Sequence, residues 1–467
     1  MKMWSGRFRQ PLDPEFERWQ RSFGFDRILL RYELAASAAH ARALKNAGVL
    51  TADELISILQ GLELVGERAA SSPSFLDDAE AEDVHHFVEK QLVALIGEVG
   101  YKLHSGRSRN EQIATDLRLY VRASIDQLRY ELAELCTLFA DRAEQSADAA
   151  MPAYTHLQRA EPVLVAHWLL AYVEMFLRDA DRLADCRKRL NVCPLGSGAV
   201  AGATLPLDRA LMAETLEFDA PTANSIDATS DRDFAIEFVN ALSLLAVHLS
   251  RWAEEMMIFS SEQYGFVALP EPYSTGSSAM PQKKNPDLLE LVRGKSGRVI
   301  GDATSLLVTA KGLPLAYNKD LQETQEPLFD AADTLLQMLP LVTGWMKVVA
   351  FDQEQMLDAT RAGFMNAWAA ATYLVKRGVP SRLAHERIGK AVQLCIEKNC
   401  KLQELSLGDL QSLSPAFDQG FYDSIKLSSV LAIHDVPGGT ALARVRQALN
   451  ATRKRIASLR EEVHAHA

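Results

Sequence analysis

Four polar segments of this sequence carry residue types that can bind an anion or move a proton. The first is HSGRSRNEQ at 104–112, where Arg107 and Arg109 flank Ser108 at an expected helix start. Free backbone N–H groups, the helix dipole and a guanidinium together favour a bound carboxylate. A capped helix with solvated arginines accounts for the same residues equally well, so both interpretations stay open for this segment alone.

The second segment is YTHLQRAEP at 154–162, in which His156 lies between Thr155 and Gln158. Histidine can transfer a proton near neutral pH, and hydroxyl and amide neighbours can orient it or a substrate. A histidine bonded to nearby backbone is the more common case, and it is the leading interpretation when these residues are taken alone. His85, in the sequence EDVHHF, is a weaker case, for which we expect a histidine on a helix surface.

The third segment, at 274–298, is the richest and reads STGSSAMPQKKNPDLLELVRGKSGR. Glycine, serine and proline over 276–281 are typical of a flexible loop. Lys283 and Asn285 follow, and Glu290 lies one turn inside the next expected helix. A mobile loop that carries a hydroxyl, an ammonium and an amide could close over a substrate. An exposed turn followed by solvated lysines is the less favoured interpretation, because so many donors lie close together.

The fourth segment is AYNKDLQE at 316–323, whose Tyr317, Asn318, Lys319 and Gln322 offer further hydrogen-bond donors. A solvated helix start explains these residues nearly as well. Any shared chemistry therefore depends on the elements that position the four segments.

Helical periodicity dominates the sequence from residue 26 onward. Apolar residues recur at alternating spacings of three and four over 231–262, which is a heptad seam that packs against other long helices at a shallow angle. Similar stripes predict long helices over 109–145, 162–190 and 286–311. The heptad seam consists of Ala235, Phe238, Leu242, Leu245, Leu249, Trp252, Met256 and Phe259.

Local signals predict where three of these helices begin. Ser108 and Glu111 have the spacing of a capping box. Ser230, followed by Asp233, indicates a second start, and Pro162 suits the first turn of a third helix.

The sequence predicts an all-α fold, because no run of alternating β-branched and polar residues is longer than a few positions. We expect an N-terminal helical domain over 1–108, a central long-helix bundle over 109–360 and a C-terminal helical domain over 361–467. The central apolar stripes are too broad for one copy to bury, so self-association is expected. The small residues Gly294, Gly297 and Gly301 would let a neighbouring helix backbone approach closely.

Loops are expected where turn-forming residues concentrate. One contains GSGAVAG at 196–202, which lacks the preceding strand and following helix of a dinucleotide fingerprint. We interpret it as a close-packing or substrate-facing loop. The expected loops are 71–82, 146–161, 191–208, 264–286 and 312–320.

Composition argues against several classes of protein and site. The 467 residues carry a formal charge of −11 with no basic block, which disfavours nucleic acid as a partner. Five cysteines without a CxxC pair disfavour a disulfide framework or a zinc site and favour a reducing cytoplasm. The N-terminal sequence MKMWSGRF lacks the apolar stretch of a signal peptide or a membrane span. A site for an anionic substrate must therefore concentrate its own arginine and lysine.

The third segment also resembles a known signature. GSSAMPQKKNP at 276–286 matches every fixed position of GSSxMPxKxNP, which is typical of the fumarase/aspartase superfamily. The resemblance implies a mostly helical homotetramer in which five-helix central domains form a twenty-helix core. It also implies active sites built from loops of three subunits, and elimination of fumarate from a succinyl group that bears a C–N or C–O bond.

Within that superfamily the sequence is similar to the argininosuccinate lyases over nearly its whole length. The resemblance implies reversible splitting of argininosuccinate into arginine and fumarate, the last step of arginine biosynthesis, without metal or redox cofactor. Another fumarate-forming lyase and a non-catalytic, crystallin-like homologue are the alternatives. The distinguishing segments are WSGRF at 4–8, AEDVHHFVE at 81–89, KLHSGRSRNEQ at 102–112, YTHLQRAEP at 154–162, SDRDF at 230–234 and YNKDLQE at 317–323.

Carried over residue by residue, the resemblance implies a role for each segment. Ser277 would be the base that takes the Cβ proton, and Lys283 would stabilise the carboxylate into which the resulting charge spreads. His156 would supply or relay a proton to the departing nitrogen, with Glu290 orienting it. The implied substrate-binding residues are Ser22, Ser108, Arg109, Asn110, Thr155, Gln158, Asn285, Tyr317 and Gln322, and further candidates are His85, Arg232, Lys319 and Gln325.

One position departs from the family pattern. The family usually continues YNKDLQE with Asp-Lys, and that lysine contacts the carboxylate on the arginine side of the substrate. Thr324 and Gln325 stand here instead, and Gln325 can donate a hydrogen bond but carries no charge. The departure implies weaker binding of that carboxylate unless Lys319 or Arg232 compensates.

Overall fold

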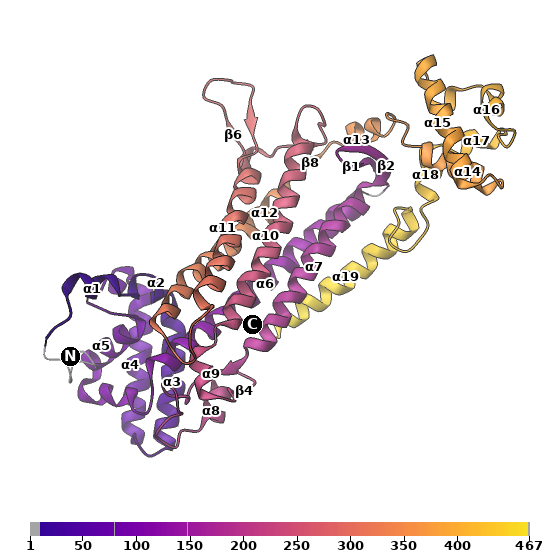
Figure 1. Cartoon of the computed structure of the whole chain (residues 1–467). Coiled ribbons are helices and arrows are strands. Elements are labelled where there is room, and N and C mark those ends of the chain that lie inside the picture. Colours follow the sequence, from indigo (N-terminus) through magenta and orange to yellow (C-terminus); the bar gives the residue numbers. More distant parts are fainter. Residues whose placement is uncertain (1–9, 79, 147, 466–467) are drawn as a thin grey trace. The chain divides into compact units, whose positions relative to one another are not determined.

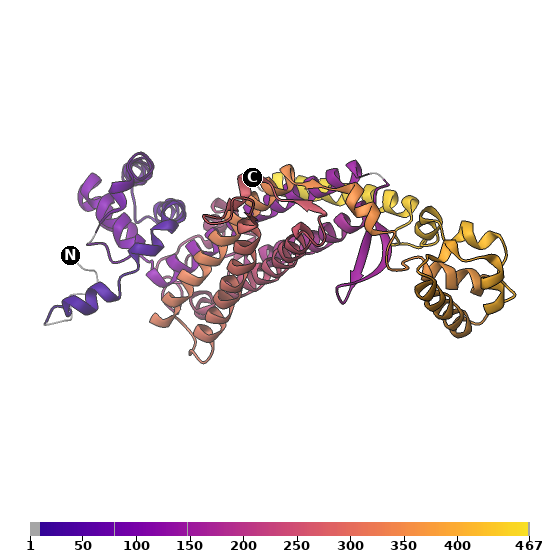
Figure 2. The same cartoon turned by 90° about the horizontal axis from the view of Figure 1, so that it is seen from above.

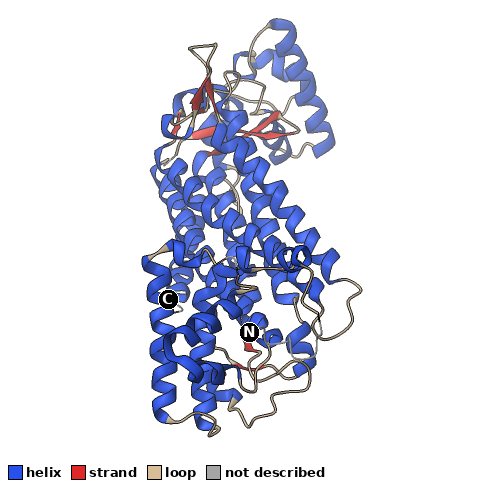
Figure 3. Ribbon diagram, turned by 90° about the vertical axis from the view of Figure 1, so that its left-hand side faces the viewer, coloured by secondary structure: helices blue, strands red, loops and turns tan. Residues whose placement is uncertain are grey.

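A computed structural model describes residues 10–78, 80–146 and 148–465 of the chain. Helices make up most of these residues, and the strands are few and short (Figure 3). The predicted all-α class is therefore confirmed. The segment WSGRF at 4–8 lies outside the described residues.

The chain divides into two compact units, each built from three separate stretches. Unit 1 comprises Met1–Gln127, Asp181–Leu244 and Gly297–Leu336. Unit 2 comprises Leu128–Ala180, Leu245–Ser296 and Gln337–Ala467. The three domains expected from the sequence stay a prediction, because long helices contribute residues to both units.

Five long helices form the scaffold: α6 (Arg109–Gln145), α7 (Val165–Leu190), α10 (Asp233–Ser260), α11 (Asp287–Ala310) and α12 (Gln325–Val348) (Figure 1). All eight residues of the predicted heptad seam on α10 are buried. In unit 1 the ring of Tyr120 on α6 packs against Phe329 on α12, with centroids 4.9 Å apart. In unit 2 Trp252 on α10 packs edge-on against Trp345 on α12 at 5.1 Å. The periodicity therefore predicted both the helices and their buried faces.

Helix α10 alone among the described residues is long and apolar enough to cross a membrane by length and composition. Half of its most apolar window is buried inside the protein. One face of α10 thus packs in the core, while Leu244 and Val247 on this helix are exposed.

Shorter helices complete unit 1, and side chains cap the starts of five of them, α1, α4, α5, α8 and α9. Thr51 and Glu54 form a reciprocal capping box at the start of α4, and the Asp83 carboxylate accepts the His86 N–H at the start of α5. These elements are α1 (Pro14–Trp19), α2 (Phe23–Asp26), η2 (Arg27–Leu29), α3 (Leu30–Asn46), α4 (Ala52–Ser71), η3 (Pro73–Leu76), α5 (Val84–Ile96), η4 (Gly97–His104), β3 (Val192–Cys193), α8 (Arg209–Thr215), β4 (Ala220–Pro221), α9 (Ser225–Ser230) and η6 (Lys319–Thr324).

Unit 2 carries three short antiparallel hairpins or pairs, β1·β2, β5·β8 and β6·β7, together with the C-terminal helices. The helices α14 to α17 share an apolar core in which Phe417 and Phe421 pack edge to face at 4.9 Å. The elements are β1 (Ala150–Thr155), β2 (Gln158–Leu164), β5 (Val267–Ala268), η5 (Glu271–Tyr273), β6 (Thr275–Gly276), β7 (Lys284–Asn285), β8 (Ala350–Phe351), α13 (Gln353–Ala359), α14 (Ala367–Lys376), α15 (Ser381–Lys398), η7 (Leu402–Glu404), α16 (Leu407–Leu413), α17 (Gly420–Ser424), α18 (Leu427–Ala432) and α19 (Leu442–His464).

The loop expected over 146–161 is wrong, because most of it forms the hairpin of β1 and β2 (Figure 2). Pro162, expected in the first turn of a helix, lies in β2 opposite Pro152, and α7 begins only at Val165. Neither proline can donate to a strand ladder, so these two strands lack the usual sequence signal.

The predicted capping of α6 is largely confirmed. Glu111 accepts the Ser108 N–H at 3.1 Å, while the Ser108 hydroxyl accepts the Asn110 N–H at 3.3 Å. The start expected at Ser230 for α10 is wrong, since Ser230 ends α9 and the Asp231 carboxylate accepts the Asp233 N–H at 2.6 Å instead.

The glycine-rich segment at 196–202 is a close-packing loop. Gly196 and Gly198 have φ of 85° and 61°, and a Cβ at Gly198 would lie 2.7 Å from the Gly202 carbonyl oxygen. The Gly198 N–H donates to the buried Glu111 carboxylate at 2.7 Å, which fastens the loop to the start of α6. Only glycine fits such turns without strain.

Candidate active site

A pocket of about 140 Å³ in unit 1 gathers residues from two of the four polar segments, 104–112 and 316–323, together with residues outside them. Asp26, Glu82, Asp83 and Ile113 are lining residues that sequence reasoning missed. Eight expected site residues line the same pocket: Ser22, His85, Arg109, Asn110, Tyr317, Lys319, Gln322 and Gln325.

Short contacts between distant segments build the Ser22 side of this pocket. The Ser22 N–H donates to the Glu82 carbonyl at 2.9 Å, and its hydroxyl donates to the Asp26 carboxyl at 2.6 Å. The Gln322 amide donates to the Gln20 carbonyl at 3.2 Å, which ties η6 to the same turn. The spacing of Ser22 and Asp26, one helical turn apart, is the sequence signal that could have identified Asp26.

Arg109 is held by the chain's own carboxylates. Its guanidinium lies 3.0 Å from Asp83 and 3.5 Å from Glu82. The solvated-arginine interpretation is wrong for Arg107 as well, because Arg107 is buried and donates to the Ser37 hydroxyl at 2.9 Å. A carboxylate that binds at Arg109 must share the guanidinium with these two acids.

Burial changes the ionisation of one wall of the pocket. Desolvation, reinforced by the negative charge of Asp83, raises the pKa of Asp26 to about 7, against the hydrogen bonds from Ser22 and Val84. Asp26 therefore exchanges its proton in the physiological range, whereas an exposed aspartate would stay ionised.

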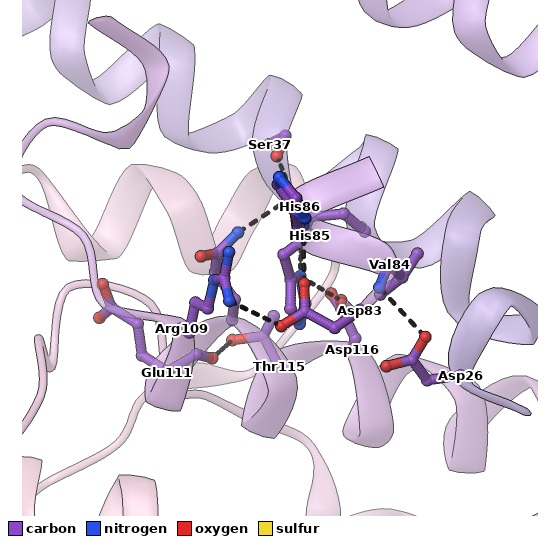
Figure 4. A network of polar contacts seen from close by, with 12 residues as sticks. Asp26, Ser37, Asp83, Val84, His85, His86, Arg109, Glu111, Thr115 and Asp116 are labelled. Atoms are coloured by element: carbon purple, nitrogen blue, oxygen red, sulfur yellow. Dashed lines mark hydrogen bonds and ion pairs between the residues drawn. The ribbon is translucent and has the colours of Figure 1, made fainter. Parts of the chain in front are cut away.

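His85 lies inside a buried network and not on a helix surface, so that expectation is wrong (Figure 4). Its Nδ1 lies 2.9 Å from the Glu33 carboxylate and 3.7 Å from Asp116. Glu33 also accepts hydrogen bonds from Ser37 at 2.6 Å and from Gln112 at 3.1 Å. Glu33 and Ser37 lie on α3, while Gln112 and Asp116 lie on α6. A pattern within one helix could therefore not predict this network.

His85 and Glu33 carry opposite charges within this network. Burial favours neutral His85, but the adjacent Glu33 carboxylate outweighs it and raises the histidine pKa to about 9. Burial likewise favours neutral Glu33, but His85 and Arg107 outweigh it and lower its pKa to about 2. The pair is thus an ion pair at neutral pH.

The ion pair predicts a pH dependence of stability. A raised histidine pKa contributes stability that is complete below the unfolded value near 6.5 and is lost as pH rises through about 9. The lowered Glu33 pKa contributes stability that is complete above 4.5 and is lost as pH falls through about 2. We expect the thermal unfolding midpoint of the wild type to fall between pH 7 and pH 9.5 more steeply than that of His85→Gln. Equal slopes in differential scanning calorimetry would contradict the ion pair.

Arg232 is buried beside the pocket without being one of its lining residues. Its guanidinium donates to the Asp231 carbonyl at 2.7 Å. Burial lowers the pKa of Arg232 to about 10, while the nearby Tyr317 acts in the opposite direction. Arg232 stays cationic at neutral pH.

In unit 2, His156 occupies the tip of the β1·β2 hairpin. His156 and Leu157 have φ of 54° and 57°, so both central residues of the turn are left-handed. Glycine and asparagine usually fill such a turn, and a histidine–leucine pair there is strained. Thr155 and Gln158 pair across the turn, and all four residues are exposed. The strain and exposure are typical of a binding surface and not of a backbone-satisfied histidine.

The serine loop joins β6 to β7 and projects beyond the start of α11 (Figure 1). The Ser277 hydroxyl oxygen accepts the Ala279 N–H at 3.2 Å and the Met280 N–H at 3.1 Å. Both donors would stabilise negative charge on that oxygen. The Asn285 amide donates to the Thr275 hydroxyl at 3.4 Å, at the base of the loop.

The two neighbouring lysines of this loop differ in their contacts. Lys284 donates to the Leu269 carbonyl at 3.3 Å and lies 3.7 Å from Glu271. Lys283 has no ion pair within 4.0 Å among the described residues, so its ammonium is available for a ligand. The side chains of His156 and Glu290 are both exposed, and no described hydrogen bond joins them.

The expected site residues thus form two groups within the chain. Unit 1 brings eight of them to one pocket, and Ser108 caps the helix that begins there. Arg232 also belongs to unit 1, and unit 2 carries the remaining expected residues on two hairpins and at the start of α11.

Comparisons with known proteins identify the family of the chain. The family described as Lyase matches residues 6–301, and the family described as Argininosuccinate lyase C-terminal matches residues 364–432. The argininosuccinate lyase of Koribacter versatilis is 58% identical over 467 residues, which is 100% of each chain. That of Acidobacterium capsulatum is 59% identical and covers 98% of this chain and 96% of its own.

Solved structures show the same fold. A variant of EDDS lyase with bound fumarate superposes with a TM-score of 0.86 at 26% identity, covering 98% of this chain and 93% of its own. A class II fumarase from Schistosoma mansoni superposes with a TM-score of 0.73 at 16% identity, over 86% and 90% of the two chains, which is a likeness of fold alone. The full-length identity to curated relatives is decisive, and the chain belongs to the argininosuccinate lyase family of the fumarase/aspartase superfamily.

Proposed function

We propose that this chain eliminates fumarate reversibly from argininosuccinate and releases arginine. The observation that carries the proposal is that the Ser277 hydroxyl oxygen accepts hydrogen bonds from two backbone N–H groups within the family's signature loop. A serine hydroxyl is a weak base, and fixed donors at its oxygen are what it needs to act as one.

The reaction begins with proton transfer from the substrate's Cβ to Ser277. Charge spreads from that carbon into the adjacent carboxylate, where Lys283 and Asn285 hold both oxygens and lower the barrier. The C–N bond then breaks, and the departing nitrogen takes a proton from His156, directly or through water, with Glu290 orienting the imidazole. One proton leaves carbon and one reaches nitrogen, so fumarate and arginine result without oxidation or reduction.

The remaining site residues divide between the two halves of the substrate. Ser22, Tyr317 and Gln322, with Lys319 and Arg232 near them, would contact the arginine portion. Their place in or beside one pocket supports a shared ligand. The residues assigned to the succinyl carboxylates are Arg109, Asn110, Thr155 and Gln158, with Ser108 and His85 beside them.

We further propose that the chain acts as a homotetramer whose subunits share active sites. The exposed face of α11 supports this, because Leu291 and Val308 are 57% and 55% exposed. A Cβ at Gly294, Gly297 or Gly301 would meet no atom of its own chain within 4 Å, so another chain's helix can approach there. A cytoplasmic location is also proposed, and the five free cysteines support it.

The departure at Gln325 gives a testable prediction. Gln325 lines the pocket, is 3% exposed and leaves its amide oxygen without a hydrogen-bond partner among the described residues. We expect Gln325→Lys to lower the KM for argininosuccinate about tenfold, since a charged hydrogen bond is worth about 1.5–3 kcal/mol. Gln325→Met is the uncharged control and should not lower it. A KM for Gln325→Lys equal to that of the wild type would show that Lys319 or Arg232 already supplies the charge.

The assay that tests the proposed function follows fumarate absorbance in the presence of argininosuccinate. Adenylosuccinate, aspartate and malate serve as the competing substrates. Fumarate from one of these alone would identify another lyase of the superfamily, and no turnover of any would favour a non-catalytic homologue.

A further inference from the structure

A buried charge cluster adjoins the unit 1 pocket, and two of its three members, Glu33 and Asp116, have no part in the mechanism above. It consists of Glu33 on α3, His85 on α5 and Asp116 on α6, which each place one polar atom within 4.8 Å of the others. His85 and Asp116 are labelled in Figure 4. The three residues are 1%, 6% and 0% exposed. Charged groups almost never reach such depth unless a specific partner holds them.

Glu33 is the anionic centre of this cluster. His85 contacts one carboxylate oxygen at 2.9 Å, while Ser37 and Gln112 donate to the other at 2.6 and 3.1 Å. The Arg107 guanidinium lies 3.8 Å from Glu33. These contacts satisfy a carboxylate and would leave a protonated acid with too few acceptors, so Glu33 is ionised.

Asp116 has the opposite character. Neither of its oxygens has a hydrogen-bond partner among the described residues. Burial, reinforced by the negative charge of Glu33, raises the pKa of Asp116 well above its usual range. The raised pKa favours the neutral form of Asp116, which leaves Glu33 as the main anion of the cluster. Two cations, Arg107 and His85, already lie beside it, so the cluster has no surplus of negative charge for a divalent cation.

The cluster reaches the pocket only through His85. This residue lines the pocket with Arg109 and Asn110, and its Nε2 has no partner among the described residues. Asp26, Glu82 and Asp83 give the same pocket three carboxyls against the cations of Arg109 and Lys319. A cationic His85 offsets this acidic wall, which would otherwise repel a substrate that carries carboxylates.

We propose that Glu33 is a positioning residue of the active site, which holds His85 cationic through Nδ1 so that Nε2–H donates to a carboxylate of the bound substrate. The proposal rests on the proposed function, since it takes argininosuccinate as the ligand of the pocket. Glu33 itself touches no substrate and acts through the histidine. A lone surface histidine could not do this, because it is mostly neutral above its ordinary pKa near 6.5.

Several charged or titratable groups face His85 from the elements packed around it, and each contributes to its proton affinity. Glu33 on α3 and Asp83 before α5 stabilise the cation most, and the effect of the more distant Asp116 is the smallest of the three. The groups are Asp26, Glu33, Asp83, Glu89, His104, Arg107, Arg109 and Asp116.

The test compares Glu33→Gln with Asp116→Asn in the full-length enzyme. Both changes replace a carboxyl with an amide of the same shape, but the first removes the carboxylate that lies 2.9 Å from His85 Nδ1, and the second removes a carboxyl 3.7 Å away. For Glu33→Gln we expect the KM for argininosuccinate at pH 8 to rise at least about tenfold with little change in kcat. We also expect the alkaline limb of the kcat/KM profile to move to lower pH by more than one unit, because His85 then loses its proton at a lower pH. For Asp116→Asn we expect both quantities to stay near the wild-type values.

Each outcome either supports or overturns the proposal. An unchanged alkaline limb in folded Glu33→Gln, or a limb that moves in Asp116→Asn and not in Glu33→Gln, overturns the proposal. If Glu33→Gln does not fold, Glu33→Asp replaces it, because this variant keeps the charge. For Glu33→Asp, an alkaline limb of kcat/KM displaced by more than one pH unit overturns the proposal. A smaller displacement supports it. If the wild type releases no fumarate from argininosuccinate, the proposed function itself has failed, and the inference fails with it for a different reason.

Discussion

Replacing Ser277 with alanine is expected to abolish turnover while the protein still folds and assembles. The partly buried side chain lies on a largely exposed loop, where its oxygen accepts hydrogen bonds from two backbone N–H groups of the loop. Loss of a general base typically costs 10²–10⁴ in rate, so we expect kcat to fall by about 10³ or more. Initial rates of fumarate release, with the oligomeric mass and the unfolding midpoint measured on the same sample, test this expectation.

Ser278→Ala is the matched control, because Ser278 has the same hydroxyl at the next position of the same loop but accepts no described N–H group. It should keep most of the wild-type kcat. If Ser277→Ala retained near-normal kcat, or if Ser278→Ala lost as much, the base would have been assigned to the wrong residue. The comparison separates the chemistry of the oxygen from the mobility of the loop.

Helix periodicity predicted the scaffold because it records burial along a single element. The residues of the α10 seam recur at heptad spacing, and all of them are buried. The β1·β2 hairpin escaped prediction for a physical reason. Its register pairs Pro152 with Pro162, and its turn uses His156 and Leu157 with positive φ, so it carries neither the residue alternation nor the asparagine–glycine turn that usually indicates a hairpin.

The residues of the candidate site also differ in how well the sequence predicted them. Residues in contiguous motifs, such as Arg109 and Gln322, could be named from sequence because a motif keeps its neighbours in order. The acids of the pocket could not, since Asp26 and Asp83 enter it from different elements and look like ordinary helix-end residues in isolation. His85 was misjudged for this reason. Its partners Glu33 and Asp116 lie 52 residues before it and on a later helix, and only folding brings them to one place.

Replacing Lys283 with alanine is expected to reduce kcat with a much smaller effect on KM. Its ammonium has no ion pair within 4.0 Å among the described residues, and we assign it to the carboxylate that becomes doubly charged after proton abstraction. An interaction that strengthens only as charge develops lowers the barrier without tightening substrate binding. Removing one such donor costs about 3 kcal/mol, which corresponds to a fall in kcat of roughly 10².

Lys284→Ala is the control that makes this result specific. The two lysines are adjacent and both exposed, so their removal changes the net charge of the loop equally. Lys284, however, is already engaged with Glu271 and the Leu269 carbonyl, and its loss should leave kcat within about threefold of the wild type. If the loop acted only through its net charge, the two variants would lose kcat equally. If Lys283 only bound the substrate, its removal would raise KM at constant kcat. Only stabilisation of the carbanion predicts a loss of kcat that is confined to Lys283.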